Sequence, residues 1–201
     1  MPDAVLLPKS PVLETGRLIL RAFREDDAEA VVSILRNARC AETYLLPDYP
    51  TPEDAMPLFG RLRQLSLDPD RFVYAIARKE AGGSDRLLGF LNEQTREGGA
   101  VEIGYVLHPD FWNRGYMTEA VGAVIPELFR MGAPAVRAGH FEENASSRRV
   151  MEKNGMEPIP LTEEIDYRGK VHRVLYREIT KEAFLSLPKG ENPGEEAPHR
   201  G

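Results

Sequence analysis

The 201-residue chain contains a single cysteine, Cys40, which excludes a disulfide within one molecule and any cysteine-rich zinc site. Long apolar runs are also missing, since no stretch approaches the roughly 20 residues that a helix needs to span a bilayer. Basic residues are in deficit, with 26 Lys and Arg against 32 Asp and Glu, for a net charge of -6. Because nucleic-acid binding requires a basic face that displaces counterions, the composition disfavours that function class.

Several sequence signals are absent as well. The chain has neither G-x-x-x-x-G-K-[ST] nor G-x-G-x-x-G, two common phosphate fingerprints. Residues 1–8 carry no basic region ahead of their short apolar stretch, so we expect no secretory signal and a cytoplasmic location. No set of metal ligands is visible in the sequence, and we expect no metal.

What is present indicates one globular domain. Hydrophobic residues make up 42% and charged residues 29% of the chain, values typical of a protein with a core. We interpret residues 1–12 as a loose lead-in and 13–187 as the domain. Residues 188–201 are rich in Pro, Gly and Glu, and we expect them to be disordered. Cys40 follows a helical pattern, and we interpret it as a packing residue rather than a nucleophile.

Hydrophobic periodicity predicts a mixed α+β fold. Alternation typical of strands occurs over 17–23, 72–77, 87–91, 101–107, 134–141 and 171–180. Helices are predicted to begin after Glu25, to run from Thr51 to about residue 67, and to span 118–131 and 146–154. Pro126 should kink the third of these helices or end its regular part. Short connections make the strands between 72 and 107 an antiparallel meander, with a turn at 82–85.

One stretch carries candidate chemistry and reads LHPDFWNRGYMTEA from Leu107 to Ala120. A strand ends there, the chain turns at Gly115, and a helix begins. The first turn of a helix leaves backbone N–H groups without partners at the positive end of its dipole, an arrangement that binds phosphate. Gly115 allows a ligand to approach closely, and Arg114 adds a positive charge. A plain strand-to-helix turn is the alternative interpretation.

A second stretch, NASSRRVMEKNGM from Asn144 to Met156, favours the phosphate site. Together the two stretches resemble the GNAT acetyltransferases, in particular the ribosomal-protein alanine N-acetyltransferase (RimJ/RimL-like) branch. The corresponding segments of that branch look like GYWLHPDYWGKGYATEA and NPASIRVLEKLGF, and its LETERLILRPF is similar to LETGRLILR from Leu13 to Arg21. The resemblance covers about residues 13–180. It implies a mostly antiparallel central sheet flanked by helices, in which two parallel strands, ending near His108 and spanning 136–141, are splayed to admit the pantetheine arm.

The resemblance also implies a set of residues that bind acetyl-CoA. In the family, the loop and helix start hold the CoA pyrophosphate through backbone N–H groups, and the asparagine matching Asn144 contacts the CoA arm. Asn144 is equally suited to cap the helix that follows it. Trp112 is interpreted as a packing anchor. The residues expected to bind the cofactor are Leu107, Asn113, Arg114, Gly115, Tyr116, Met117, Thr118, Asn144 and Ser147.

Catalytic residues follow from the same resemblance. Many GNAT enzymes protonate the leaving thiolate with a tyrosine at the position of Met151, which this chain lacks. The RimL-like branch uses a serine that matches Ser147, although a serine at a helix start also binds backbone. Glu102 is the candidate base because it lies on the strand that should line the acceptor cleft, with a solvated strand carboxylate as the alternative. His108 and His140 are held in reserve, and the remaining histidines, His172 and His199, are too remote.

The predicted function is transfer of acetyl from acetyl-CoA to a primary amine, foremost a protein N-terminal amine. An enzymatic alternative is acetylation of a small amine such as a polyamine, an aminoglycoside or an amino acid. A module that senses CoA without catalysis and a protein-interaction domain are the alternatives outside enzymes. The acceptor pocket is expected from 38–67 and 159–173, the least diagnostic parts of the chain, and a homodimer is an expectation from the family.

Overall fold

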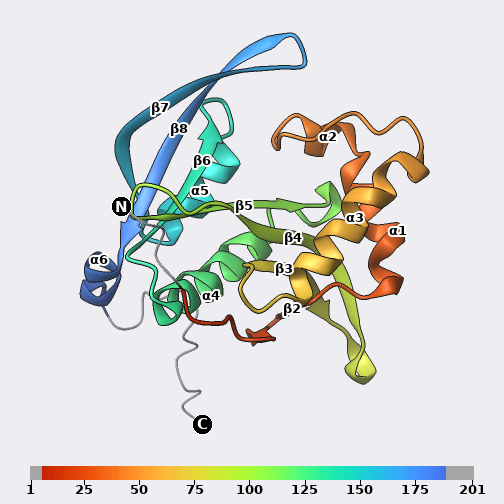
Figure 1. Cartoon of the computed structure of the whole chain (residues 1–201), viewed down its shortest axis with the longest axis horizontal. Helices are drawn as coiled ribbons and strands as arrows, with labels where there is room; N and C mark the ends of the chain where they lie inside the picture. Colours follow the sequence, from red (N-terminus) through yellow and green to blue (C-terminus); the bar gives the residue numbers. More distant parts are fainter. Residues whose placement is uncertain (1–5, 189–201) are drawn as a thin grey trace.

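The structure is a computed structural model that describes residues 6–188, and its centre is one eight-stranded sheet in the order β1-β2-β3-β4-β5-β6-β8-β7 (Figure 1). The strands are β1 (Leu13–Glu14), β2 (Leu18–Arg21), β3 (Val73–Lys79), β4 (Asp85–Thr95), β5 (Val101–Leu107), β6 (Ala135–Phe141), β7 (Glu157–Tyr167) and β8 (Lys170–Thr180). The α-helices are α1 (Ala28–Leu35), α2 (Ala38–Ala41), α3 (Pro52–Leu67), α4 (Tyr116–Met131), α5 (Ala145–Lys153) and α6 (Lys181–Ser186). All neighbouring strands are antiparallel except β5 and β6, which are parallel, so the predicted α+β class and the antiparallel meander are confirmed.

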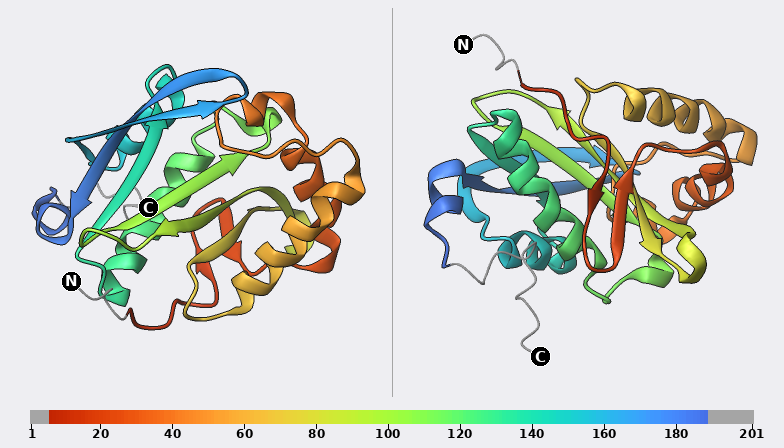
Figure 2. Two further views of the ribbon diagram at one scale, coloured as in Figure 1. Left: turned by 45° about the horizontal axis from the view of Figure 1, so that its top comes forward. Right: turned by 90° about the horizontal axis from the view of Figure 1, so that it is seen from below.

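Helices cover both faces of the sheet, and the strand sequences reflect this. In β3, Val73 and Ala75 pack into the apolar cluster of α1 and α3, while Tyr74 and Ile76 pack into the cluster of α4. Successive side chains of a strand point to opposite faces, so a strand covered on both sides is apolar throughout rather than alternating. Figure 2 shows the same three layers from two further sides.

Helix α3 begins and ends where the sequence predicts. Thr51 Oγ1 accepts from the N–H of Asp54 at 3.3 Å, and the Asp54 carboxylate accepts from the N–H of Thr51 at 2.9 Å, which completes a capping box. Among residues 6–188, no helix has the length and apolar character needed to cross a membrane.

Helix α4 shows which of the two expected effects of Pro126 does not occur. The helix runs through Pro126 to Met131, so the proline does not end it. A proline inside a helix costs about 3 kcal/mol because it removes one hydrogen bond and crowds the preceding turn. Val124, Ile125 and Leu128 around it are almost fully buried against the sheet, and each buried side chain contributes roughly 1.5–3 kcal/mol. Burial therefore outweighs the local cost.

The N-terminal segment is attached to the domain at particular residues, although Leu7 and Val12 keep exposed side chains. Leu6 is buried in the α4 cluster, and the N–H of Leu7 donates to the carbonyl of Met131 at 2.7 Å. The Lys9 ammonium is also buried and donates to the carbonyl of Ser66 at 3.0 Å. The expected disorder of the tail falls outside the described residues, apart from Pro188.

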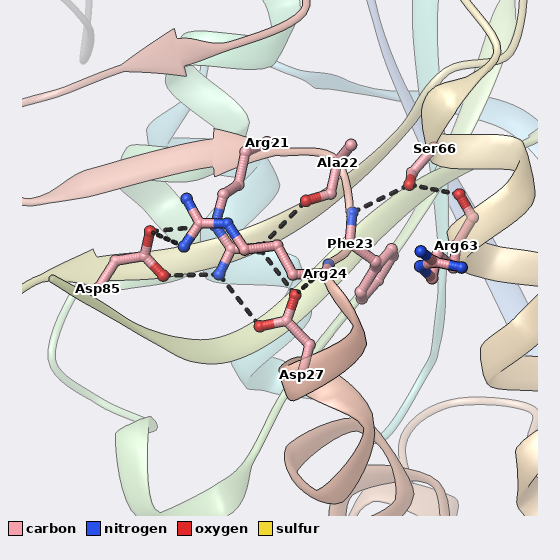
Figure 3. Close-up of polar contacts among 8 residues, drawn as sticks. All are labelled: Arg21, Ala22, Phe23, Arg24, Asp27, Arg63, Ser66 and Asp85. Atoms are coloured by element: carbon pink, nitrogen blue, oxygen red, sulfur yellow. Dashed lines mark hydrogen bonds and ion pairs between the residues drawn. The ribbon is translucent and has the colours of Figure 1, made fainter.

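A buried ion-pair network fixes the start of the sheet (Figure 3). Arg21, at the end of β2, lies 2.7 Å from the carboxylate of Asp27 and 2.6 Å from that of Asp85, and all three side chains are at most 6% exposed. Arg24 also pairs with the Asp85 carboxylate, at 3.1 Å. The network joins β2, the turn before α1 and the first residue of β4. Its charges are paired and hydrogen-bonded, the condition under which buried charge is tolerated.

Candidate active site

The two parallel strands separate shortly after they begin. β5 and β6 pair only at Val101 with Val136 and at Glu102 with Arg137, although each strand has seven residues. Beyond these two pairs, the strands diverge toward their C-terminal ends. The splayed pair expected from the sequence resemblance is therefore present, and it leaves backbone groups on the inner edges of both strands free of each other.

A cleft of about 320 Å³ lies where β5 ends and α4 and α5 begin. All of the residues predicted to bind the cofactor line it except Arg114, whose side chain is exposed outside the cleft. The cleft residues of this set are Leu107, Asn113, Gly115, Tyr116, Met117, Thr118, Asn144 and Ser147. Residues from two distant segments thus meet at one place, as the resemblance implied.

The loop before α4 takes the conformation that Gly115 permits. Gly115 has φ +77° and is the N-cap of α4, and its carbonyl accepts from the N–H of Glu119 at 3.0 Å. The N–H groups of Tyr116, Met117 and Thr118 belong to the first turn, where no helical carbonyl is available to them. They lie at the positive end of the helix dipole and line the cleft. This geometry suits an anion such as a diphosphate.

Arg17 lies in the β1–β2 turn and holds this loop in place by hydrogen bonds. No sequence pattern indicated this role. Its guanidinium donates to the carbonyl of Arg114 at 3.0 Å and to the carboxylate of Glu119 at 2.6 Å, and it lies over the ring of Tyr116 at 4.5 Å. Burial alone would raise the pKa of Glu119, but hydrogen bonds from Thr15 and Arg17 outweigh it and hold the pKa below its usual value. Glu119 is therefore a fixed anion in the first turns of α4, behind the N–H groups that line the cleft.

Helix α5 supplies the second wall of the cleft. Asn144 caps it, since its Oδ1 accepts from the N–H of Ser147 at 3.0 Å. Arg149 and Lys153, spaced so that they share one face of the helix, also line the cleft. Sequence reasoning missed both cations, although their four-residue spacing after the predicted cap was a usable signal. Backbone amides on one wall and cations on the other fit a polyphosphate.

Ser147 has a hydroxyl partner that the sequence did not indicate. Its Oγ lies 2.9 Å from the Oη of Tyr105, which comes from the splayed part of β5. Burial raises the pKa of Tyr105, and the hydrogen bond with Ser147 opposes that rise. No local pattern could reveal this pair, because the two residues lie 42 positions apart.

The side chain of Glu102 lies on the face of β5 opposite to that of Tyr105. Alternation along β5 puts Glu102, Gly104 and Val106 on the face of α1 and α3, away from Tyr105 and Leu107. Glu102 does not line the cleft; it lies where β5 and β6 still pair. Its pKa is raised, first by burial and then by the charge of Glu163, while Arg137 opposes the rise.

Of the other candidates, Trp112 lines the cleft, whereas His108, His140 and Cys40 lie outside it. His108 Nδ1 accepts from the N–H of Asp110 at 3.4 Å, and His140 is buried with its Nδ1 2.8 Å from the carbonyl of Phe141. Trp112 anchors the end of β5, since its Nε1 donates to the carbonyl of Leu107 at 2.8 Å, and it contacts both large apolar clusters. Cys40 is fully buried, and burial raises its pKa to about 12, which leaves it a packing residue. His199 lies outside the described residues.

The face that carries Glu102 is crossed by a contact between two distant loops. The hydroxyl of Tyr167, at the tip of the β7–β8 hairpin, lies 2.9 Å from the carbonyl and 3.2 Å from the N–H of Leu46. The neighbouring Arg168 pairs with Asp48. Figures 1 and 2 show this hairpin reaching across toward the segment around α2. Both regions expected to shape the acceptor pocket therefore meet above the sheet.

The family model for the acetyltransferase (GNAT) domain matches residues 17–157. The chain belongs to the GNAT acetyltransferase family. YoaA, an uncharacterized N-acetyltransferase of Bacillus subtilis strain 168, is 29% identical over 150 residues, which are 73% of this chain and 83% of YoaA.

Two solved GNAT structures have the same fold. The GNAT-family acetyltransferase of Bacillus anthracis superposes with a TM-score of 0.72 at 24% identity, over 85% of this chain and 99% of that one. The ribosomal L7/L12 α-N-protein acetyltransferase RimL, in complex with coenzyme A, has a TM-score of 0.70 at 20% identity, over 86% of this chain and 99% of RimL. At these identities the likeness concerns the fold. Membership of the family makes this GNAT chain an N-acetyltransferase, and the family uses acetyl-CoA.

Proposed function

We propose that this GNAT enzyme transfers acetyl from acetyl-CoA, bound in the cleft between α4 and α5, to a primary amine, foremost the N-terminal amine of a protein. The divergence of β5 from β6 after Glu102 carries the proposal. It gives the thioester a path from the cleft into the gap between the two strands. Glu102 then lies on the face of the sheet that carries α1 and α3, from which an amine can approach.

The diphosphate of acetyl-CoA is assigned to the first turn of α4. The N–H groups of Tyr116, Met117 and Thr118 supply hydrogen bonds there, and Arg149 and Lys153 add charge from α5. The residues at the loop, Asn113 and Gly115, keep the backbone open toward the ligand. Asn144 orients α5 as its cap. Arg114 contributes through its carbonyl, which holds Arg17 in place.

Three further residues are assigned to the chemistry. Glu102 takes the proton of the attacking amine, directly or through a water, and its raised pKa brings it closer to the range of an effective base. The N–H of Leu107 stabilises the oxyanion that forms on the thioester carbonyl, a kind of interaction whose loss costs about 10²–10³ in rate. Ser147 gives a proton to the departing sulfur.

The contact between Tyr167 and Leu46 favours a slender acceptor over an internal site on a folded protein. The contact bridges the acceptor face, so an extended chain end or a compact amine passes more easily than the surface of a folded partner. Among such acceptors, the RimJ/RimL-like sequence pattern around Ser147 favours a protein N-terminus.

One experiment separates the candidate functions. Isothermal titration calorimetry with acetyl-CoA and CoA comes first, followed by thiol detection with an acceptor panel of peptides with free N-terminal Ala or Ser, a polyamine, an aminoglycoside and free amino acids. Turnover of the peptides, with their N-acetylated copies inert, supports the proposal. Turnover of the small amines alone assigns the enzyme to the small-molecule class. Binding without thiol release across the panel indicates a CoA sensor, and a lack of binding rejects the cofactor site.

A further inference from the structure

Tyr105 and Ser147 form a hydroxyl pair that spans the cleft. Tyr105 stands on the splayed part of β5 and Ser147 in the first turn of α5, and their oxygens are 2.9 Å apart. The carbonyl of Ser147 lies farther from Tyr105 Oη, at 3.4 Å, so Oγ is the nearer acceptor for the single phenol proton. The backbone of Ser147 is held in turn by Asn144. The serine hydroxyl therefore has a defined orientation that a surface serine would lack.

The residue one helical turn further along α5 cannot supply a proton. Met151 lies on the same helical face as Ser147 and is fully buried, and a thioether has no proton to donate. Ser146 of α5 also lines the cleft, but Ser147 is hydrogen-bonded to a second hydroxyl, so the Tyr105–Ser147 pair is the candidate that protonates a departing sulfur from this wall. A serine that has lost its proton needs a neighbour that returns one.

We propose that Tyr105 is a positioning residue for Ser147: its phenol orients the serine hydroxyl toward the sulfur of acetyl-CoA and returns the proton that the serine gives up. This inference rests on the proposed function. As the carbon–sulfur bond breaks, sulfur takes the proton of Ser147 Oγ, and Oγ takes the proton of Tyr105 Oη. The acceptor nitrogen loses one proton when the amide forms, and that proton, passed through solvent, restores the phenol. The sulfur gains one proton and the nitrogen loses one, so the pair ends as it began.

The surroundings of Tyr105 suit this role. The side chain packs against the α4 cluster, and burial keeps the pKa of its phenol above its ordinary value of about 10. The phenol is therefore protonated throughout the neutral range and always has a proton to give. A serine alkoxide would be costly there, which favours simultaneous movement of the two protons, and the raised pKa of the phenol favours its reprotonation by the proton that solvent returns.

The test is a double-mutant cycle read in kcat and in CoA affinity. Tyr105→Phe and Ser147→Ala should each lower kcat by about 10²-fold, the lower end for loss of acid–base assistance, while calorimetric affinity for CoA is retained. Tyr105→Phe added to Ser147→Ala should cause little further loss, because the phenol acts through the serine. A tyrosine with a merely structural role would lower kcat equally in both backgrounds. Tyr74→Phe, which removes a buried phenol that donates to the carbonyl of Ser10 outside the cleft, is the matched control.

A second measurement does not depend on turnover. Calorimetry compares CoA with desulfo-CoA between about pH 7 and pH 9.5, across the ordinary thiol pKa of about 8.5. If the serine hydroxyl donates to the sulfur, the affinity advantage of CoA should grow as the thiolate forms. That growth should disappear in Ser147→Ala and weaken in Tyr105→Phe.

The outcomes of the two proposals are distinguishable. The role of Tyr105 alone is overturned if the wild-type enzyme acetylates a member of the panel and Tyr105→Phe leaves kcat undiminished. It is likewise overturned if the wild type is active and the losses of the two single variants multiply in the double variant. A wild-type protein that binds CoA but acetylates nothing overturns the proposed function and this inference with it.

Discussion

Arg17 donates to the carboxylate of Glu119 at 2.6 Å and to the carbonyl of Arg114 at 3.0 Å, so one side chain from the β1–β2 turn holds both ends of the turn that begins α4. The salt bridge itself is partly exposed, since the Arg17 side chain is 49% accessible, and such a pair contributes little to stability. Its effect should instead be on the position of the turn, and therefore on cofactor affinity.

Glu119→Gln should weaken CoA binding about tenfold and lower the melting temperature by a few degrees. The amide keeps the shape of the side chain but removes the anion that fixes Arg17, and a hydrogen bond to a charged group contributes roughly 1.5–3 kcal/mol. Calorimetric titration of CoA measures the change. Glu53→Gln, in the first turn of α3, is the matched control and should not alter affinity. Equal CoA affinity in the two variants would contradict the bracing role.

Gly115→Val should abolish most CoA affinity while the protein stays folded. Gly115 has φ +77°, a conformation that costs a β-branched residue roughly 1–2 kcal/mol, and an added Cβ would lie 3.4 Å from Arg17. Relief of this strain moves the amides that are proposed to grip the diphosphate. Gly82→Val carries the same kind of strain at φ +78° in a distant turn with open space around it. Both variants should lose a few degrees in thermal melting, but Gly115→Val alone should fail to bind CoA.

Asp85→Asn should lower the free energy of unfolding by about 3 kcal/mol at neutral pH, because it leaves part of the buried Arg21 charge without a partner. Hydrogen bonding to Arg21 is the main reason that the pKa of Asp85 lies below its ordinary value of 3.8. A carboxyl with a depressed pKa stabilises the fold above its unfolded-state pKa, and that contribution disappears as the pH falls through the folded-state pKa.

Urea unfolding at about pH 7 and below about pH 4 measures both effects of Asp85→Asn. The difference from the wild type should be largest at neutral pH and should shrink in acid. Asp110→Asn, whose side chain is 74% exposed, is the control and should change the unfolding free energy little. A difference that stays constant down to low pH would show that the ion pair is not its source.

Local signals predicted the elements that local chemistry determines. Thr51, Pro52 and Asp54 predict the start of α3, because helix capping involves residues within one turn of each other. β7 escaped prediction because its prolines, Pro158 and Pro160, and its acidic residues are atypical of a strand. They are tolerated there because β7 is the edge of the sheet and its register is interrupted between Pro158 and Thr162.

The site was predictable only in part for the same reason. Its backbone turn and the cap of α5 are short sequence patterns, and the family resemblance located both. Arg17 and Tyr105 contribute through contacts with Glu119 and Ser147 that span 102 and 42 positions. Such contacts depend on how β2, β5 and α5 are placed relative to one another in the fold. A short stretch of sequence carries no information about that placement.

The pH dependence of kcat should identify Glu102 as the base. The carboxylate must be deprotonated to accept a proton, so activity should rise with pH through the pKa of Glu102. That pKa is raised above 4.5, first by burial and next by Glu163, against the opposing charge of Arg137. Because Arg137 and Glu163 carry opposite charges, substituting one or the other should shift the pKa of Glu102 in opposite directions.

Arg137→Leu should shift the acidic limb of the kcat profile to higher pH, because it removes the cation that favours the carboxylate and also frees Glu178, its partner at 2.7 Å. Glu163→Gln should shift the limb to lower pH, because it removes a repelling charge. The acceptor amine also titrates and can produce a limb of its own in the pH profile. Because the pKa of the amine is a property of the substrate, neither substitution in the enzyme should shift that limb. Glu102→Gln should lower kcat by about 10²-fold or more and remove the movable limb. If both neighbouring substitutions leave the profile in place, the base is a group other than Glu102.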